Sequence, residues 1–319
     1  MATLNEILAA LAARKHPVQL VKNEDDLSNA ERARMTWPAI STVKEDGVYA
    51  AVCWPSDCPF PVYLSRTGNV FYLPGYVGER LITGATGGSF SKDSGEVYIT
   101  ELCNHKLSLE VLSGLVNTNR KAGWSESELH YMLEYGRLVV RDVLTVAEFM
   151  QGRSNVPYGL RLSTLRSMFP VCNVVRYAIL HDQESWEGYA QDWIDADEEG
   201  AVLHQLNAPW VAGPKSEVSV KRVRGIDLDL CCTGWSLGKG KRSAQVAKLH
   251  FEYRGKSFSA DLGKGWTDAK RDELTARAQS LNDDVTGSIF HIHGLQISSK
   301  GVIRLPKVCE ERIDKVEAD

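Results

Sequence analysis

Lys44 stands in a short stretch whose residue types could make a lysine side chain a nucleophile. Residues 43–49 read VKEDGVY, so the lysine precedes an Asp-Gly pair at the entrance to the apolar segment 47–54, a predicted strand. A lysine becomes nucleophilic when neighbouring cations and removal from water lower its pKa. Gly47, which has no side chain, would let the backbone approach a bound substrate closely. Taken alone, the tetrapeptide Lys-x-Asp-Gly at 44–47 is common in proteins, and a surface turn is the simpler interpretation.

Several short charged motifs follow Lys44 in order along the chain. They read LSRTG at 64–68, ITEL at 99–102, LVVRDVL at 138–144, EEGAVL at 198–203, SVKRVRGIDL at 219–228, GVIRLP at 301–306 and RIDK at 312–315. In this order they resemble the motifs of the covalent nucleotidyltransferases, and among them the compact bacteriophage type of ATP-dependent DNA ligase. That family's motifs run Lys-x-Asp-Gly-x-Arg, Ser-Arg-x-Gly, Asp-Gly-Glu, a strand ending in an aromatic and Asp, Glu-Gly, Lys-x-Lys and Arg-x-Asp-Lys. Each motif is short, and the order and spacing carry the resemblance.

The resemblance implies a nucleotide site around Lys44. Lys44 would attack the α-phosphorus of ATP and carry AMP, and Lys221 would neutralise the α-phosphate. Glu199 would sit beside the reacting phosphate. The expected nucleotide contacts are Val43, Lys44, Arg66, Glu101, Arg141, Glu199 and Lys221. Arg66 and Glu101 would hold the ribose hydroxyls and a nucleic-acid terminus, so Arg66 is also an expected DNA contact.

The resemblance also implies a metal and a second group of catalytic residues. Glu101 and Glu199 would place Mg²⁺, for which Mn²⁺ can substitute, and carboxylates together with phosphates suit this ion. Arg312, Asp314 and Lys315 would orient the departing pyrophosphate. Phosphoryl transfer depends on in-line positioning and charge neutralisation, which such residues provide.

The chain departs from the family pattern at four positions. Tyr49 stands where the family has Arg, and Thr100 replaces the Gly before the motif carboxylate. Arg141 stands where an aromatic ring usually stacks on adenine, although a guanidinium plane could stack instead. Ser219 replaces the first Lys of Lys-x-Lys, and Lys215 could compensate for it.

The charge is unevenly distributed, although the 319 residues carry a net charge of only −4. Residues 215–271 contain 13 Lys and Arg against 6 Asp and Glu, so the remainder is acidic. A basic stretch beside an acidic body suggests a polyanionic partner. The Gly-rich loop 238–243 is expected to track DNA phosphates through Lys239, Lys241 and Arg242, with a flexible solvated hairpin as the simpler alternative.

The remaining composition excludes several classes of protein. The N-terminus lacks a basic region and a long apolar core, so it is not expected to be a signal peptide, and no apolar run is long enough for a membrane span. The seven Cys show no repeated spacing and are expected to be reduced thiols. His291 and His293 alternate on a predicted strand and point to one face, but no further ligands have a helpful spacing for metal binding.

The pattern of apolar residues predicts mixed strands and helices at 1–223 and a small β-barrel such as an OB-fold at 224–319. The resemblance implies that 1–223 is an α+β adenylation domain with antiparallel sheets. An N-terminal helix is expected from the Thr3–Glu6 capping box. The other predicted helices are 145–151, 159–168 and 267–281. Strands are predicted at 47–54, 62–65, 97–103, 138–144, 174–180, 201–204, 226–232, 245–253, 256–261 and 290–298.

The sequence thus predicts a monomeric, cytoplasmic enzyme of a bacteriophage or bacterial host that seals nicked double-stranded DNA with ATP. An RNA ligase or RNA-capping nucleotidyltransferase is the enzymatic alternative, since these share the lysine chemistry. A degenerate homologue that only binds DNA is the other alternative, motivated by the departures at Tyr49 and Ser219.

Overall fold

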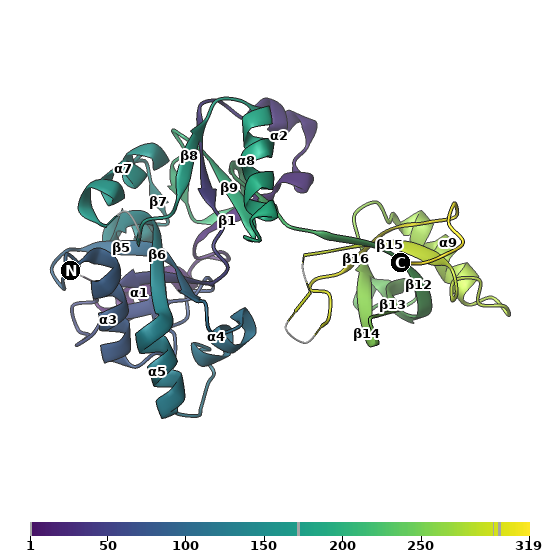
Figure 1. Cartoon of the computed structure of the whole chain (residues 1–319), viewed down its shortest axis with the longest axis horizontal. Helices are drawn as coiled ribbons and strands as arrows, with labels where there is room; N and C mark the ends of the chain where they lie inside the picture. The colour runs from purple at the N-terminus through teal and green to yellow at the C-terminus, as the bar shows by residue number, and fades with distance from the viewer. Residues whose placement is uncertain (1, 171–172, 296, 299–300) are drawn as a thin grey trace. The chain divides into compact units, whose positions relative to one another are not determined.

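The chain divides into two compact units, Met1–Val223 and Arg224–Asp319. The computed structural model describes residues 2–170, 173–295, 297–298 and 301–319. Figure 1 labels the helices and strands of both units. None of the helices in the described ranges is long and apolar enough to cross a membrane.

A four-stranded sheet forms one half of the first unit, in the order β4-β3-β5-β6. Its strands are β3 (Val48–Cys53), β4 (Val62–Leu64), β5 (Glu96–Asn104) and β6 (Gly136–Thr145). Both faces are covered, which explains why β3 and β4 consist almost entirely of apolar residues, whereas β5 and β6 also carry charged side chains. On β3, Ala50 and Val52 face one core, whereas Ala51 and Cys53 face the other.

Helices on both sides of this sheet complete the two cores. Figure 1 shows α3 (Gly75–Thr86) and α5 (Glu126–Tyr135) side by side, and both pack against β6. The first core also receives side chains from α4 (Leu109–Leu115) and α7 (Tyr158–Met168), and the second from α1 (Leu4–Ala12) and α6 (Val146–Gln151). The two-stranded pair β7 (Arg153–Ser154) and β10 (Trp210–Val211) lies beyond α6.

A five-stranded sheet forms the other half of this unit, in the order β1-β11-β9-β2-β8. Its strands are β1 (Gln19–Asn23), β2 (Ala39–Val43), β8 (Tyr177–Leu180), β9 (Gly200–Gln205) and β11 (Gly213–Val223). The pairings of this sheet are antiparallel except that β1 runs parallel to β11. Helix α8 (Gln183–Asp195) covers one face and buries Trp186 and Ala190 against β2 and β9. The short helices η1 (Glu24–Asp26) and α2 (Asn29–Ala33) follow β1.

The second unit is a closed five-stranded barrel in the order β12-β13-β14-β16-β15. Its elements are β12 (Ile226–Leu237), η3 (Gly240–Arg242), β13 (Val246–Tyr253), β14 (Lys256–Leu262), α9 (Asp268–Ala278), β15 (Ile289–Gly294) and β16 (Lys307–Glu311). Inward residues such as Leu230, Phe251 and Phe290 meet Leu274 of α9 in one core. Five strands closed around a core with one added helix are consistent with an OB-fold.

The structure confirms the predicted α+β class, and most predicted elements are present within one or two residues. Thr3 and Thr145 form the expected capping boxes, and Thr267 caps α9. The predicted strand 174–180 begins only at Tyr177, and the predicted strand 290–298 ends at Gly294; residue 296 of that prediction lies outside the described residues. Helices α2, α3, α4, α5 and α8 were not predicted, and neither were strands β1, β2, β7, β10, β11 and β16.

Candidate active site

Lys44 lies immediately after β2, the strand of the five-stranded sheet between β8 and β9. Its backbone N–H donates to the Gly200 carbonyl at 2.9 Å, and its Nζ donates to Glu199 Oε2 at 2.5 Å. Both side chains are 20% exposed, so the ion pair is reachable from solvent but largely desolvated. The structure thus brings Lys44, the predicted nucleophile, into direct contact with Glu199, which was predicted to sit beside the reacting phosphate.

Two glycines allow this approach of Lys44 and Glu199. A Cβ at Gly200, where φ is +133°, would lie 2.2 Å from the Arg222 carbonyl of the neighbouring strand β11. A Cβ at Gly47 would lie 2.6 Å from the Leu102 carbonyl of β5. These distances are too short for any side chain. Gly200 therefore lets β9 begin directly beside β11, and Gly47 lets β3 begin directly beside β5. The close neighbour of Gly47 is therefore β5 rather than a bound substrate.

Glu45, the residue after Lys44, forms ion pairs with two arginines. Glu45 is only 6% exposed, and it accepts hydrogen bonds from Arg137 Nη2 at 3.0 Å and Arg176 Nη2 at 3.5 Å. Arg176 also pairs with Glu198 at 2.5 Å. This network links Glu45, which follows Lys44, to Glu198, which precedes Glu199.

Lys221 lies among further cations, one of which is Lys44. Lys221 projects from β11, and burial, together with the positive charges of Lys44, Arg66 and Lys215, lowers its pKa despite the opposing charge of Glu199. Such a mutual effect requires these side chains to lie near one another. Lys215 was the residue expected to compensate for Ser219, and it contributes to this positive field. A group of cations with one carboxylate favours an anionic ligand with several charged oxygens.

Arg141 is placed by an irregularity in the sheet. Ile99 pairs with Asp142 and Thr100 pairs with Val140, so Arg141 is the extra residue of a β-bulge in β6. Bulges redirect side chains, and here the guanidinium lies 3.1 Å from a Glu101 carboxylate oxygen. Its Cζ is also 5.8 Å from the centre of the Tyr49 ring. Two residues of the predicted nucleotide site, Arg141 and Glu101, therefore form an ion pair with each other.

Two arginines lie near the Tyr49 ring. Arg66, in the tight turn that follows β4, places its Cζ 5.8 Å from the same ring. The Tyr49 hydroxyl and Arg141 Nε are buried, and neither has a hydrogen-bond partner among the described residues. Unpaired buried donors are costly, and a ligand with several oxygen acceptors would satisfy them.

His204, Tyr158 and Ser219 form a polar cluster that sequence reasoning missed. The His204 ring lies 4.2 Å from the Tyr158 ring between centroids, and its Nδ1 is 3.0 Å from Ser219 Oγ. Burial, followed by the charges of Arg141 and Arg161, lowers the pKa of His204 to about 3, which keeps the ring neutral. The alternation along β9 could have identified His204, because it falls four residues after Gly200 and two after Val202, which is on the same face.

The predicted metal ligands Glu101 and Glu199 do not form a preorganised metal site by themselves. Glu199 pairs with Lys44 and Glu101 pairs with Arg141. Within the described part of the chain, no three His, Cys, Asp or Glu side chains are grouped as metal ligands. Separate carboxylates beside cations fit a Mg²⁺ ion held mainly by phosphate oxygens and water, which is this ion's usual arrangement.

The other predicted residues belong to the second unit. Lys239 and Lys241 are exposed in and beside η3, whereas Arg242 is half-buried and pairs with Asp268 at 3.1 Å. Arg312, Asp314 and Lys315 follow β16, and Arg312 makes a two-bond pair with Asp314 at 3.0 and 2.8 Å.

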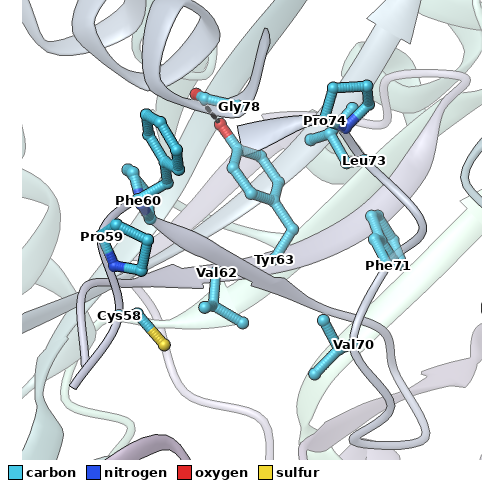
Figure 2. A pocket seen from close by; sticks show the side chains of 11 residues that line it. Cys58, Pro59, Phe60, Val62, Tyr63, Val70, Phe71, Leu73, Pro74 and Gly78 are labelled. Carbon is cyan, nitrogen blue, oxygen red and sulfur yellow. Dashed lines mark hydrogen bonds between the residues drawn. The ribbon is translucent and has the colours of Figure 1, made fainter. Parts of the chain in front are cut away.

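A cavity of about 180 Å³ in the first unit contains none of these residues (Figure 2). It lies between the segment before β4, the loop after that strand and α3, and across it the Tyr63 hydroxyl donates to the Gly78 carbonyl at 2.7 Å. The lining is apolar, with Pro59, Phe60, Val62, Val70, Phe71, Leu73 and Pro74. The Cys58 thiol also lines the cavity, but burial raises its pKa, which disfavours the nucleophilic thiolate, so the candidate site is the cluster around Lys44.

No family model matches the chain. Among curated proteins, a probable DNA ligase of Streptomyces avermitilis is 30% identical over 188 residues, which are 52% of this chain and 36% of that protein. A probable DNA ligase of Rhodococcus opacus is 27% identical over 183 residues, or 51% of this chain and 36% of the relative. The chain thus matches little more than a third of the length of these relatives.

Solved structures share the fold over almost the whole chain. A Lig E DNA ligase superposes with a TM-score of 0.63 and 17% identity, covering 92% of this chain and 98% of that one. The ATP-dependent DNA ligase of bacteriophage T7, in complex with ATP, gives 0.51 and 17%, with 93% and 99% covered. A structure named Pmar-Lig_PreS3 gives 0.71 and 15%, with 92% and 67% covered. At such identities the likeness is one of fold.

Proposed function

We propose that this chain, which has the fold of the compact ATP-dependent DNA ligases, is itself an ATP-dependent ligase that seals nicks in duplex DNA. The single observation that carries the proposal is the Lys44–Glu199 contact at 2.5 Å, surrounded by cations in a partly buried site. In the proposed reaction a 5′-phosphate and a 3′-hydroxyl are joined after AMP has been carried on Lys44. The curated relatives, named probable DNA ligases, support this activity.

The first chemical step is self-adenylation. Lys44 Nζ forms a bond to the α-phosphorus of ATP, the bond from that phosphorus to the β-phosphate oxygen breaks, and pyrophosphate leaves. The ammonium must lose a proton before attack, and Glu199 Oε2 is placed to receive it. Lys221 would neutralise the α-phosphate, which stabilises the charge that develops during transfer.

The rest of the nucleotide would be held along the two sheets. Val43 would approach it through its backbone, Arg66 and Glu101 through the ribose, and Arg141 through the base. The unpaired donors of Tyr49 and Arg141 fit a nucleotide, which is rich in oxygen and nitrogen acceptors. Glu101 and Glu199 would hold Mg²⁺ or Mn²⁺, which would draw charge from the phosphates.

Transfer of AMP to DNA completes the proposed reaction. The AMP passes from Lys44 to the 5′-phosphate of the nick, and the 3′-hydroxyl then attacks that phosphate and releases AMP. The adenylation domain would be 1–223, and the 224–319 barrel would contact DNA phosphates through Lys239, Lys241 and Arg242. Arg312, Asp314 and Lys315 would orient pyrophosphate. We infer that the enzyme acts as a monomer in the cytoplasm of a bacterium or an infected host.

The function is tested by supplying α-labelled ATP or GTP with Mg²⁺ and mapping any labelled peptide after denaturation. We expect AMP on Lys44, and transfer of the label to the 5′ end of nicked duplex DNA in a chase. Labelling by GTP, or transfer only to RNA ends, would instead indicate a capping enzyme or an RNA ligase. Absence of label from protein stripped of bound AMP with pyrophosphate would favour a homologue that only binds DNA.

The lowered pKa of Lys221 predicts the pH dependence of self-adenylation. The ammonium is present below its folded-state pKa and lost as the pH rises through it, so the wild-type rate should decline at a lower pH than an ordinary lysine would permit. Lys221→Arg keeps its charge, and we expect its alkaline decline to lie at least about one pH unit higher. The measurement is the initial rate of AMP labelling against pH.

Lys22→Arg is the matched control for this profile. Lys22 is also a partly buried lysine, paired with Glu31 at 2.6 Å, and its replacement should leave the profile unchanged. If the labelling rates of wild type and Lys221→Arg declined at the same alkaline pH, Lys221 would not be the group whose charge the reaction needs.

A further inference from the structure

Asp229 is buried on a face of the barrel where a strand residue would ordinarily be exposed. On β12, Leu228, Leu230 and Cys232 point into the barrel core, so Asp227, Asp229 and Cys231 point outward. Asp227 and Cys231 are exposed, as this alternation predicts, but Asp229 is only 4% exposed. Something on the outside of the barrel must therefore cover it.

The cover is the segment that follows β16. Arg312 Nη1 donates to Asp229 Oδ2 at 2.7 Å, and Lys315 Nζ lies 2.5 Å from the same oxygen. The Asp229 backbone N–H donates to Asp319 Oδ2 at 2.7 Å, and its carbonyl accepts from the Asp319 N–H at 2.8 Å. Asp229 thus binds this segment at three positions, through both its side chain and its backbone.

The neighbouring strand holds the carboxylate in place. His291, directly opposite on β15, lies with Nδ1 2.8 Å from Asp229 Oδ1. Burial opposes ionisation of Asp229, but hydrogen bonds from Lys315 and His291 and the charge of Arg312 outweigh it and lower its pKa. One carboxylate oxygen therefore faces the histidine and the other receives both cations.

We propose that Asp229 is a positioning residue for self-adenylation, because it holds Arg312 and Lys315 side by side on the barrel. The proposal rests on the proposed function, in which these two cations orient pyrophosphate. Both are long side chains that would lose considerable conformational freedom on binding an anion. Their shared contact with Asp229 fixes that freedom in advance. Their side chains remain 25% and 37% exposed, so unused N–H donors are still available to a ligand.

This role confines the effect of Asp229 to steps that involve pyrophosphate. We expect Asp229→Ala to lower the rate of AMP labelling from ATP by about 10- to 100-fold, the scale of a misplaced catalytic group. The reverse reaction, release of ATP from adenylated protein by added pyrophosphate, should fall by a similar factor. Nick sealing by protein that already carries AMP should proceed at the wild-type rate.

Asp227→Ala is the matched control. Asp227 lies two residues away on the same face and contacts His293 and His291 at 2.8 and 3.3 Å, but it touches neither Arg312 nor Lys315 in the described contacts. It should leave all three rates unchanged. In a protein that already lacks both cations, through Arg312→Ala and Lys315→Ala, Asp229→Ala should cause no further loss of labelling.

The outcomes separate this proposal from the proposed function. If wild type is labelled with AMP and Asp229→Ala is labelled equally fast, the positioning role of Asp229 is wrong but the proposed function stands. Equal loss of labelling and of sealing, or further loss in the background without the two cations, would show that Asp229 only maintains the barrel. If Asp229→Ala does not fold, Asp229→Asn, which keeps the shape but removes the charge, is measured in its place and must show the same separation. Wild type that takes no label overturns the proposed function instead.

Discussion

Lys44→Ala should abolish covalent labelling by ATP, with a loss of at least about 10,000-fold, the scale seen when an enzyme loses its nucleophile. We expect no other lysine to replace it, because the proposed reaction needs an amine beside Glu199, and Lys44 Nζ is the amine that donates to that carboxylate. The measurement is the amount of labelled protein after denaturing electrophoresis. Nicked-DNA binding should persist, since the variant removes one side chain of the first unit and leaves the barrel's basic loop unchanged.

Lys22→Ala is the control for Lys44→Ala. Lys22 belongs to the same unit, its side chain is 16% exposed against 20% for Lys44, and it also pairs with a glutamate. Labelling should survive this change. Label retained by Lys44→Ala at a different lysine would refute the assignment of the nucleophile.

Asp142→Ala should destabilise the first unit by about 3–5 kcal/mol, because it leaves a buried arginine without its counter-charge. Arg161, on α7, makes two bonds to Asp142 on β6, at 2.7 and 3.0 Å, and the two residues are 4% and 6% exposed. A loss of this size is a large part of the stability of an ordinary domain. The free energy of unfolding is measured by urea denaturation of the whole chain.

Two further variants identify the cause of that loss. Arg120 pairs with Glu128 at 2.9 Å near the surface, so Arg120→Ala should cost no more than about 1 kcal/mol. The double change Asp142→Leu with Arg161→Met removes both charges and should recover much of the lost stability. An Asp142→Ala protein as stable as wild type would show that the pair contributes nothing net.

Much of the fold was predictable because local patterns determine it. The strand around Tyr49 and the helix capped by Thr145 follow from apolar alternation and capping chemistry, which depend only on neighbouring residues. Helix α3 was missed because Gly75, Gly78 and Gly84 lower its helix propensity. Helix α8 was missed although Trp186, Tyr189, Ala190 and Trp193 recur at helical spacing and pack into one core. Packing against the sheets stabilises both helices.

The order of the motifs was enough to predict a nucleotide site around Lys44, because the chemistry of phosphate requires particular residue types. The roles of those residues remain proposals, while their placement is a property of the fold. The β-bulge in β6 that pairs Arg141 with Glu101 could not be predicted from any local sequence pattern. His204 entered the site from β9 without any motif of its own.

By itself the sequence determined the α+β class, the strand-rich C-terminal region and the identity of the candidate nucleophile, since these depend on residue type and spacing along the chain. Only the tertiary structure decided which charges meet. Glu199 reaches Lys44 across 155 residues, and Asp229 reaches Arg312 across 83. Contacts over such separations depend on strand register and on which segments cover a strand, and those are set by packing of the whole unit rather than by any local stretch.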